Sequence, residues 1–242
     1  MFDFPEFLEF SITEPIDAGV QWMLQNLSFI FDAITAVIVA MFNVVEAGLL
    51  FVPWFVYVAL VLYLGTKFHG YKTGITLAIM MTLIGVFGLW ESMIYTLVVV
   101  IISVIVSLLI GLPLGILMAK SERGERVMKP ILDAMQTMPS FVYLIPAVML
   151  FGLGRVPAVF ATTIYAVPPL IRLTYLGITG VEKEVIEAGK AFGSTSRQML
   201  FKIELPQALP TIMTGVNQTT MMAMAMVVIS SMIGAEGIGS EV

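Results

Sequence analysis

The sequence predicts an all-α polytopic protein, in which several helices cross a membrane. Hydrophobic residues make up 59% of its 242 residues and charged residues only 12%, which is too apolar for a soluble domain of this size. Several uninterrupted apolar runs reach the roughly 20 residues that a helix needs to cross about 30 Å of hydrocarbon. Cysteine is absent, which excludes disulfides, thiol catalysis and thiolate metal sites.

Residues 1–50 form an acidic N-terminal segment, in which we expect an amphipathic helix lying in the membrane interface. This segment contains seven carboxylates and no Lys or Arg. Between residues 20 and 48 apolar residues recur at helical spacing, and Gln21, Gln25 and Asp32 lie mostly on the opposite face, as is typical of an interfacial helix. A spanning helix is the alternative, because the run from Phe29 to Pro53 is long enough.

Residues 51–242 are predicted to form a transmembrane domain of about six spans. The expected spans are 50–66, 73–90, 92–118, 138–154, 157–179 and 208–234. The first, third and fifth connecting loops contain ten of the twelve Lys and Arg residues. The positive-inside rule therefore places these loops in the cytoplasm, including the fifth, which contains residues 181–206.

Glycine and proline are frequent within the predicted spans. Gly111, Pro113 and Gly115 are predicted to interrupt the third span, and Pro168 with Pro169 the fifth. Such breaks suit either a pathway that opens and closes or close helix packing, and both interpretations stay open. The candidate pathway or gate residues are Pro139, Pro146, Pro168, Arg172 and Asn217.

Arg172 is the one basic residue inside a predicted span, and Asp133 precedes the fourth span. An intramembrane Arg is a functional candidate by default. Since Arg172 lies about two turns from the cytoplasmic end, we favour snorkelling or a structural ion pair over a role in substrate binding.

The polar stretch between the last two spans predicts two short helices on the cytoplasmic surface. Apolar residues from Val181 to Phe192 recur at helical spacing. Gly193 lies where a helix stop needs a residue that tolerates a positive φ. Ser194 or Thr195 can then cap a second short helix, which Pro206 is expected to end.

This stretch resembles the EAA loop of bacterial ABC importer permeases, which in that family is the coupling helix that docks on a cytoplasmic ATPase. The only departure from the pattern is Gly189 in place of the usual Ala. The residues at the positions of this pattern, which the resemblance assigns to ATPase coupling, are Glu187, Ala188, Gly189, Gly193, Ile203, Leu205 and Pro206.

Two further stretches, Gln136 to Pro146 and Gly215 to Thr219, are similar to the permease subunits of importers for glycine betaine and proline betaine. The resemblance implies a type I ABC importer (MetI-like) transmembrane fold in the bacterial inner membrane. It further implies a homodimer of two permease copies, ABC ATPase subunits and an external substrate-binding protein. Family members carry at least one more span after the segment Gly234 to Gly239, so we expect either that the sequence is shortened or that this last helix is absent.

The resemblance also predicts a transport subunit that is not itself an enzyme, with ATP and Mg bound by the partner ATPase and no cofactor in this chain. In agreement, no phosphate-binding loop of the form G-x-x-x-x-G-K-[ST] occurs, and no catalytic site, metal site or nucleic-acid partner is expected. The nearest rival is an ABC permease for amino acids such as methionine. A secondary transporter or channel is less favoured, because apart from Arg172 the spans contain almost no charged coupling residues.

Overall fold

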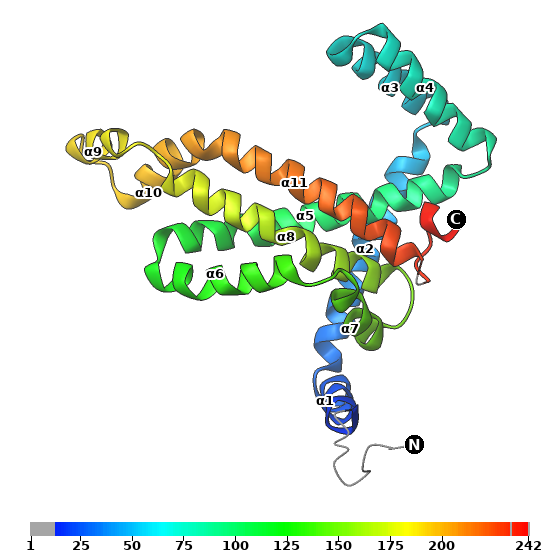
Figure 1. Ribbon diagram of the computed structural model, residues 1–242, viewed down its shortest axis with the longest axis horizontal. Helices are drawn as coiled ribbons and strands as arrows, with labels where there is room; N and C mark the ends of the chain where they lie inside the picture. Colours follow the sequence, from blue (N-terminus) through cyan, green and yellow to red (C-terminus); the bar gives the residue numbers. More distant parts are fainter. Residues whose placement is uncertain (1–12, 233, 242) are drawn as a thin grey trace, which may run out of the picture.

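The computed structural model describes residues 13–232 and 234–241. Three long helices lie side by side and form a bundle: α5 (Trp90–Lys120), α8 (Arg155–Thr179) and α11 (Leu205–Ser231) (Figure 1). Each is long and apolar enough to cross a membrane. α8 packs against both of the others and is the most buried of the three. These helices match the predicted third, fifth and sixth spans to within a few residues.

The close approach of α5 to α8 depends on two glycines on one face of α5. A Cβ atom on Gly115 would lie only 2.5 Å from Thr174 Cβ and 2.8 Å from the Ile171 carbonyl oxygen. A Cβ atom on Gly111 would lie 2.8 Å from Leu170 Cδ2. Small residues allow such contact in a membrane, where the hydrophobic effect does not drive helices together. The structure therefore supports the packing interpretation of these two glycines.

Most of the predicted breaks in the spans are absent, and this part of the sequence prediction is wrong. α5 continues through Pro113, and α8 continues through Pro168 and Pro169, both of which are buried. A proline inside a transmembrane helix is tolerated where neighbouring helices compensate for the missing hydrogen bond. Such neighbours surround the prolines of α8, so these residues end no helix.

The predicted fourth span, 138–154, exists as one helix, α7 (Phe141–Phe151), but this helix is shorter than predicted. It meets the preceding helix, α6 (Glu122–Thr137), at an angle of 96°. At 1.5 Å per residue α7 is only about 17 Å long, too short to cross the hydrocarbon alone. The cause of the break is Pro139, which disfavours helical geometry in the residue before it. Met138 accordingly has an extended ψ of 137°.

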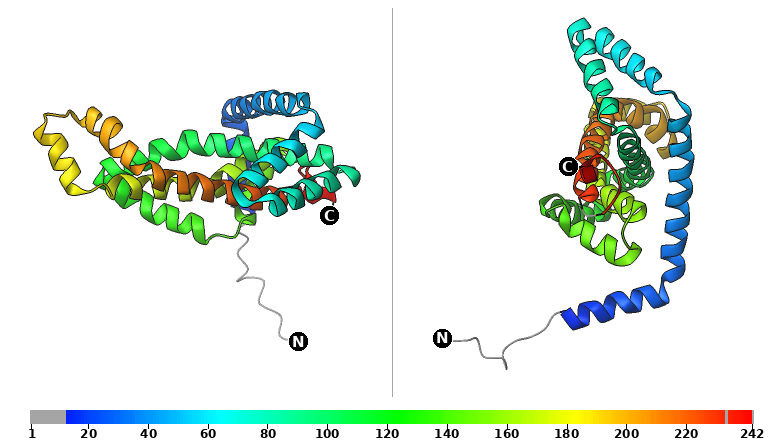
Figure 2. Two further views of the ribbon diagram at one scale, coloured as in Figure 1. Left: turned by 90° about the horizontal axis from the view of Figure 1, so that it is seen from above. Right: turned by 90° about the vertical axis from the view of Figure 1, so that its right-hand side faces the viewer.

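In the N-terminal part of the chain, α1 (Thr13–Asn26) leads into α2 (Ser28–Phe51). The length and hydropathy of α2 alone would allow it to span a membrane. However, α2 runs across the bundle rather than along it (Figure 1 and the right-hand view of Figure 2). This direction favours the interfacial placement predicted for residues 20–48. The acidic residues before Thr13 lie outside the described part of the chain.

Helices α3 (Trp54–His69) and α4 (Tyr71–Val86) form a hairpin beside the bundle. Gly65 and Gly74 allow its two helices to approach closely, since a Cβ atom on Gly65 would lie 2.7 Å from Gly74 Cα. Each helix has 16 residues and is therefore about 24 Å long, shorter than the hydrocarbon layer. The first and second predicted spans thus exist as helices, but both fall short of spanning length.

Arg155, at the start of α8, holds α2 and the C-terminal segment against the bundle. Its guanidinium nitrogens lie 3.6 Å from a carboxylate oxygen of Glu46 on α2 and 3.6 Å from one of Glu236. The guanidinium also lies 4.6 Å from the ring centroid of the fully buried Phe42, and Tyr95 of α5 is 5.5 Å away. Such cation–π contacts add to the ion pairs, so four parts of the chain meet at this residue.

Candidate functional site

The candidate coupling segment, residues 181–206, begins with α9 (Lys183–Ala191). The helix ends in a Schellman motif: the Gly193 N–H donates to the Lys190 carbonyl over 2.9 Å, and the Ser194 N–H donates to the Gly189 carbonyl over 3.1 Å. Gly193 has a φ of 74°, which an L side chain adopts only with strain. The predicted role of Gly193 as the helix stop is confirmed.

The packing around Gly189 explains why glycine replaces the usual alanine at this position of the EAA pattern. It is buried where α9 packs on the following helical turn, and a Cβ atom there would lie 2.7 Å from Ile203 Cδ1 and 2.8 Å from Met199 Cε. Both atoms are the ends of flexible side chains, so an alanine would need only a local shift. Glycine therefore brings α9 closer to Met199 and Ile203 than alanine would.

After the turn, α10 (Ser196–Gln198) and the π-helix η2 (Met199–Glu204) lead directly into α11. Thr195 is the predicted N-cap and forms a capping box with Gln198. Pro206 does not end this helix, contrary to the prediction, because it lies in the first turn of α11, where proline is tolerated. A proline ring normally clashes with the preceding turn, and the wider π-helical turn before Pro206 relieves this clash.

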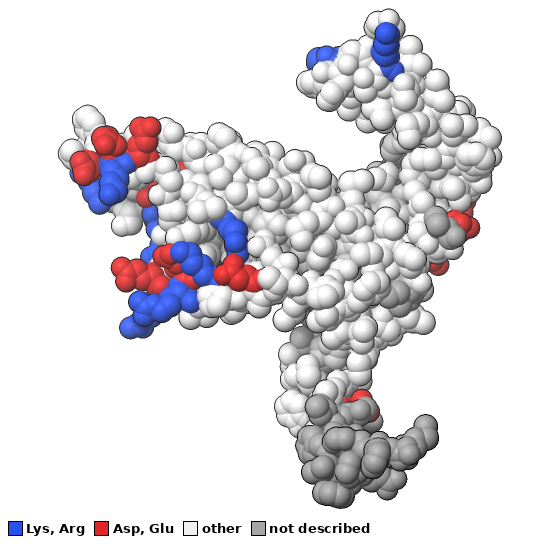
Figure 3. Space-filling model, in the orientation of Figure 1, with Lys and Arg blue, Asp and Glu red and all other residues white. Residues whose placement is uncertain are grey.

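The far end of α9 presents charged and apolar side chains to solvent. Glu187, Ala188 and Lys190 are exposed, and Lys and Arg gather with Asp and Glu at this end of the molecule (Figure 3). Phe192 is 90% exposed at the tip, and Phe201 on η2 is 63% exposed. Sequence reasoning placed Phe192 on the apolar face of α9 and missed that this face points away from the protein.

Glu204 is the second residue that sequence reasoning missed. It is only 5% exposed, and its Oε2 atom forms an ion pair with the ammonium of Lys120, the last residue of α5. The contact lacks the geometry of a hydrogen bond, so it is a charge–charge contact. A cavity of about 620 Å³ opens beside the pair and is also lined by Lys190 and Arg197.

The structure does not bring the five candidate pathway residues together. Pro139 lies at the bend between α6 and α7, Pro146 is exposed on α7, and Pro168 is buried inside α8. Arg172 forms an ion pair with Asp133 of α6, which agrees with the favoured structural interpretation. Asn217 is exposed near the middle of α11, next to the exposed Gln218.

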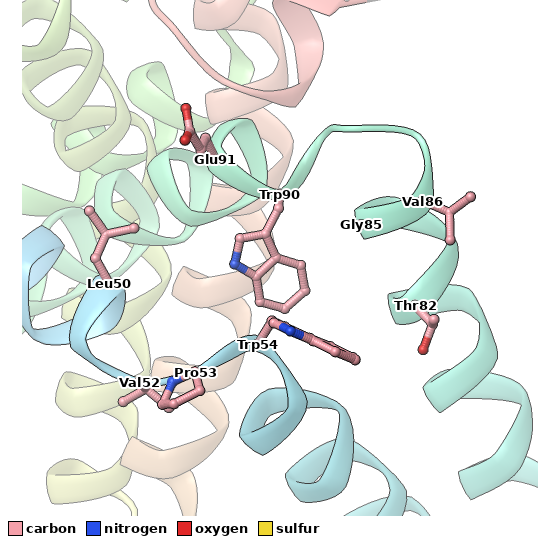
Figure 4. Close-up of a pocket in the computed structure, with 9 residues that line it drawn as sticks. All are labelled: Leu50, Val52, Pro53, Trp54, Thr82, Gly85, Val86, Trp90 and Glu91. Atoms are coloured by element: carbon pink, nitrogen blue, oxygen red, sulfur yellow. The ribbon is translucent and has the colours of Figure 1, made fainter.

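A pocket of about 540 Å³ lies at the opposite end, between the start of α3, the end of α4 and the start of α5 (Figure 4). Trp54 and Trp90 both line it. The indole of Trp90 points toward that of Trp54, whereas the Glu91 carboxylate points away from both (Figure 4). The pocket therefore has an aromatic wall without a charged group directed into it.

Comparison with known proteins finds matches along most of the chain. Residues 111–242 match the family of binding-protein-dependent transport system inner membrane components. The glycine betaine/proline betaine transport system permease protein ProW of Escherichia coli (strain K12) is 43% identical over 94% of this chain, which spans 66% of that protein. The glycine betaine transport system permease protein OpuAB of Bacillus subtilis (strain 168) is 44% identical over 96% of this chain, which spans 82% of it.

Among solved structures, an inward-facing conformation of the MetNI methionine ABC transporter is similar to this chain, with a TM-score of 0.57 and 24% identity. The similarity covers 66% of this chain and 79% of that chain. At this identity the likeness concerns the fold alone, and it agrees with the MetI-like fold expected from the sequence.

Proposed function

Since this chain belongs to the family of binding-protein-dependent transport system inner membrane components, we propose that it is the permease subunit of an ATP-driven importer. Its proposed cargo is glycine betaine, proline betaine, choline or a related compatible solute. Two relatives more than 40% identical, each covering over 90% of the chain and named for glycine betaine, carry this proposal. The methionine alternative rests on a likeness of fold at 24% identity and is weaker.

The coupling segment is the proposed docking site for the ATPase, which binds ATP and Mg in place of this chain. Its exposed face combines the charge of Glu187, the small side chain of Ala188 and the ring of Phe192. Exposed aromatic side chains beside small residues are typical anchors of protein interfaces. Because α9 and its turn project from the end of the bundle (Figure 1), a partner can reach this face without contacting the spans.

The exposed face of α11 supports a translocation pathway formed with a second copy of the chain. Asn217 and Gln218 lie near the middle of a helix that is long and apolar enough to span. Facing lipid would leave their amides without hydrogen-bond partners, which is costly. We therefore infer that this face lines a water-filled pathway or contacts the second copy of a symmetric homodimer.

The distribution of charge supports a location in the bacterial inner membrane with the coupling segment in the cytoplasm. The basic residues of α6 lie at the same end of the bundle as the coupling segment, whereas Lys67 and Lys72 of the α3–α4 hairpin lie apart from them (Figure 3). Arg155 lies toward the opposite end, where an external binding protein would deliver the substrate. This asymmetry is what the positive-inside rule requires of a multi-pass protein.

The test is uptake by the assembled transporter. Vesicles containing this permease, its ATPase and its external binding protein should accumulate radiolabelled glycine betaine only when ATP is supplied. Unlabelled proline betaine or choline should compete, and methionine should not. ATP-independent uptake would contradict the importer mechanism, and uptake of methionine in place of glycine betaine would contradict the substrate class.

A further inference from the structure

Residues 181–206 are joined covalently to two bundle helices, α8 before them and α11 after them. A movement of the coupling segment therefore reaches α8 and α11 through the chain itself. α5 has no such connection, although its glycine face packs closely on α8. Any movement of α5 with the coupling segment has to pass through side-chain contacts.

Lys120 and Glu204 provide such a contact. Among the ion pairs of residues 13–232 and 234–241, theirs is the one that connects the coupling segment to another helix. Glu204 is 5% exposed, so its charge is poorly screened by solvent and strongly favours a nearby cation. The side-chain hydrogen bonds of the coupling segment are all local to Thr195 and Gln198.

The neighbouring helix α6 is held by a different set of contacts. Tyr175 of α8 donates a hydrogen bond of 2.7 Å to Glu125 Oε1 of α6, and Arg172 of α8 pairs with Asp133 of α6. α6 is thus tied to α8, whereas the end of α5 is tied to η2. Both helices of the α5–α6 hairpin therefore contact α8, but among the described residues only the end of α5 also contacts η2 through an ion pair.

We propose that the Lys120–Glu204 pair is a strut that transmits movement of the coupling segment to the cytoplasmic end of α5. Glu204 is a positioning residue, since its buried carboxylate acts through Lys120. Glu204 is the last residue of η2 and directly precedes the first residue of α11. The proposal rests on the proposed function, because it assumes that an ATPase moves this segment.

The experiment compares Glu204→Gln, Lys120→Gln and the exchanged double variant Lys120→Glu with Glu204→Lys in the assembled transporter. Lys129→Gln is the matched control, because Lys129 also pairs with a glutamate at this end, but that pair lies outside the coupling segment. All variants are compared at equal amounts in the vesicle membrane. The measurements are ATPase association, ATP hydrolysis, and glycine betaine taken up per ATP hydrolysed.

Both single variants should still bind the ATPase and hydrolyse ATP, while uptake per ATP falls by roughly 5-fold or more, the lower end of typical coupling between sites. The exchanged double variant should recover most of the loss, and Lys129→Gln should match the wild type. Wild-type coupling in both single variants would overturn the proposal, as would a double variant no better than either single one. Failure of the proposed function would look different, because the wild-type protein itself would then show no ATP-dependent uptake.

Discussion

Substitutions of Gly193 test whether the shape of the α9 turn controls docking. A Cβ atom at this position would meet nothing within 4 Å, so the cost of alanine comes from the backbone φ of 74°. A left-handed conformation costs an alanine about 1–2 kcal/mol, whereas Asn and Asp adopt it more readily. Such a cost lowers the population of the native turn relative to competing conformations by a factor of roughly 5–30.

Gly193→Ala should therefore weaken ATPase association by up to this factor, and Gly193→Asn should stay close to the wild type. Gly193→Asp fits the same backbone but adds a negative charge beside the C-terminal end of α9, where the helix dipole is also negative. It should lower association and uptake through charge. Titrating the ATPase onto permease vesicles would give these affinities. An Asn variant as weak as the Ala variant would refute the argument from backbone strain.

Four further predictions concern other parts of the molecule. Glu187→Lys should reduce substrate-stimulated ATP hydrolysis in vesicles, because it reverses a charge on the docking face. Lys67→Ala, at the tip of the α3–α4 hairpin, should leave this hydrolysis unchanged. Equal effects of the two substitutions would argue against a local docking face. Gly115→Ala should destabilise the protein by about 1–3 kcal/mol, measured by a thermal melt in detergent. The loss should exceed that of Gly111→Ala, because the new Cβ atom at position 115 meets a backbone carbonyl, whereas the one at position 111 meets a flexible leucine. A smaller loss for Gly115→Ala would contradict this packing. Arg155→Gln should leave the bundle folded but increase hydrogen exchange in α2, since it removes the contacts to Glu46 and Phe42; unchanged protection of α2 would show that these contacts do not hold it. A cysteine replacing Lys190 should resist a membrane-impermeant thiol reagent in intact cells and one replacing Arg155 should react; labelling at position 190 would reverse the proposed orientation.

The features that could be predicted from the sequence are those that depend on neighbouring residues along the chain. The three bundle helices follow from uninterrupted apolar runs, and the turn at Gly193 follows from the local requirement for a positive φ. The predicted breaks at Pro113 and Pro168 failed because a proline interrupts a helix only when nothing compensates for it. Whether α5 and α8 stabilise each other at these positions depends on tertiary packing, which the periodicity of apolar residues along the sequence does not indicate.

The exposure of Phe192 was also beyond sequence reasoning, and for a similar reason. Helical spacing shows which residues share a face of α9 but not which way that face points. In the structure Val185 and Ile186 turn partly toward the protein, whereas Ala188 and Phe192 point outward. An apolar surface that points away from its own chain needs a partner more than one that covers a core, so the structure strengthens the case for docking.

The position of Glu204 shows that a sequence motif can contain a residue whose tertiary contact the motif does not indicate. In this part of the EAA pattern the specified positions fall on Ile203, Leu205 and Pro206, and residue 204 is not specified. The specified residues have local roles, since Ile203 packs near Gly189 and Pro206 begins α11. Glu204 instead depends on Lys120, which belongs to a distant part of the chain and approaches only because α5 ends beside η2. A pattern that records spacing within one segment carries no information about such a pair, so an ionic connection between the coupling segment and α5 becomes visible only in the folded protein.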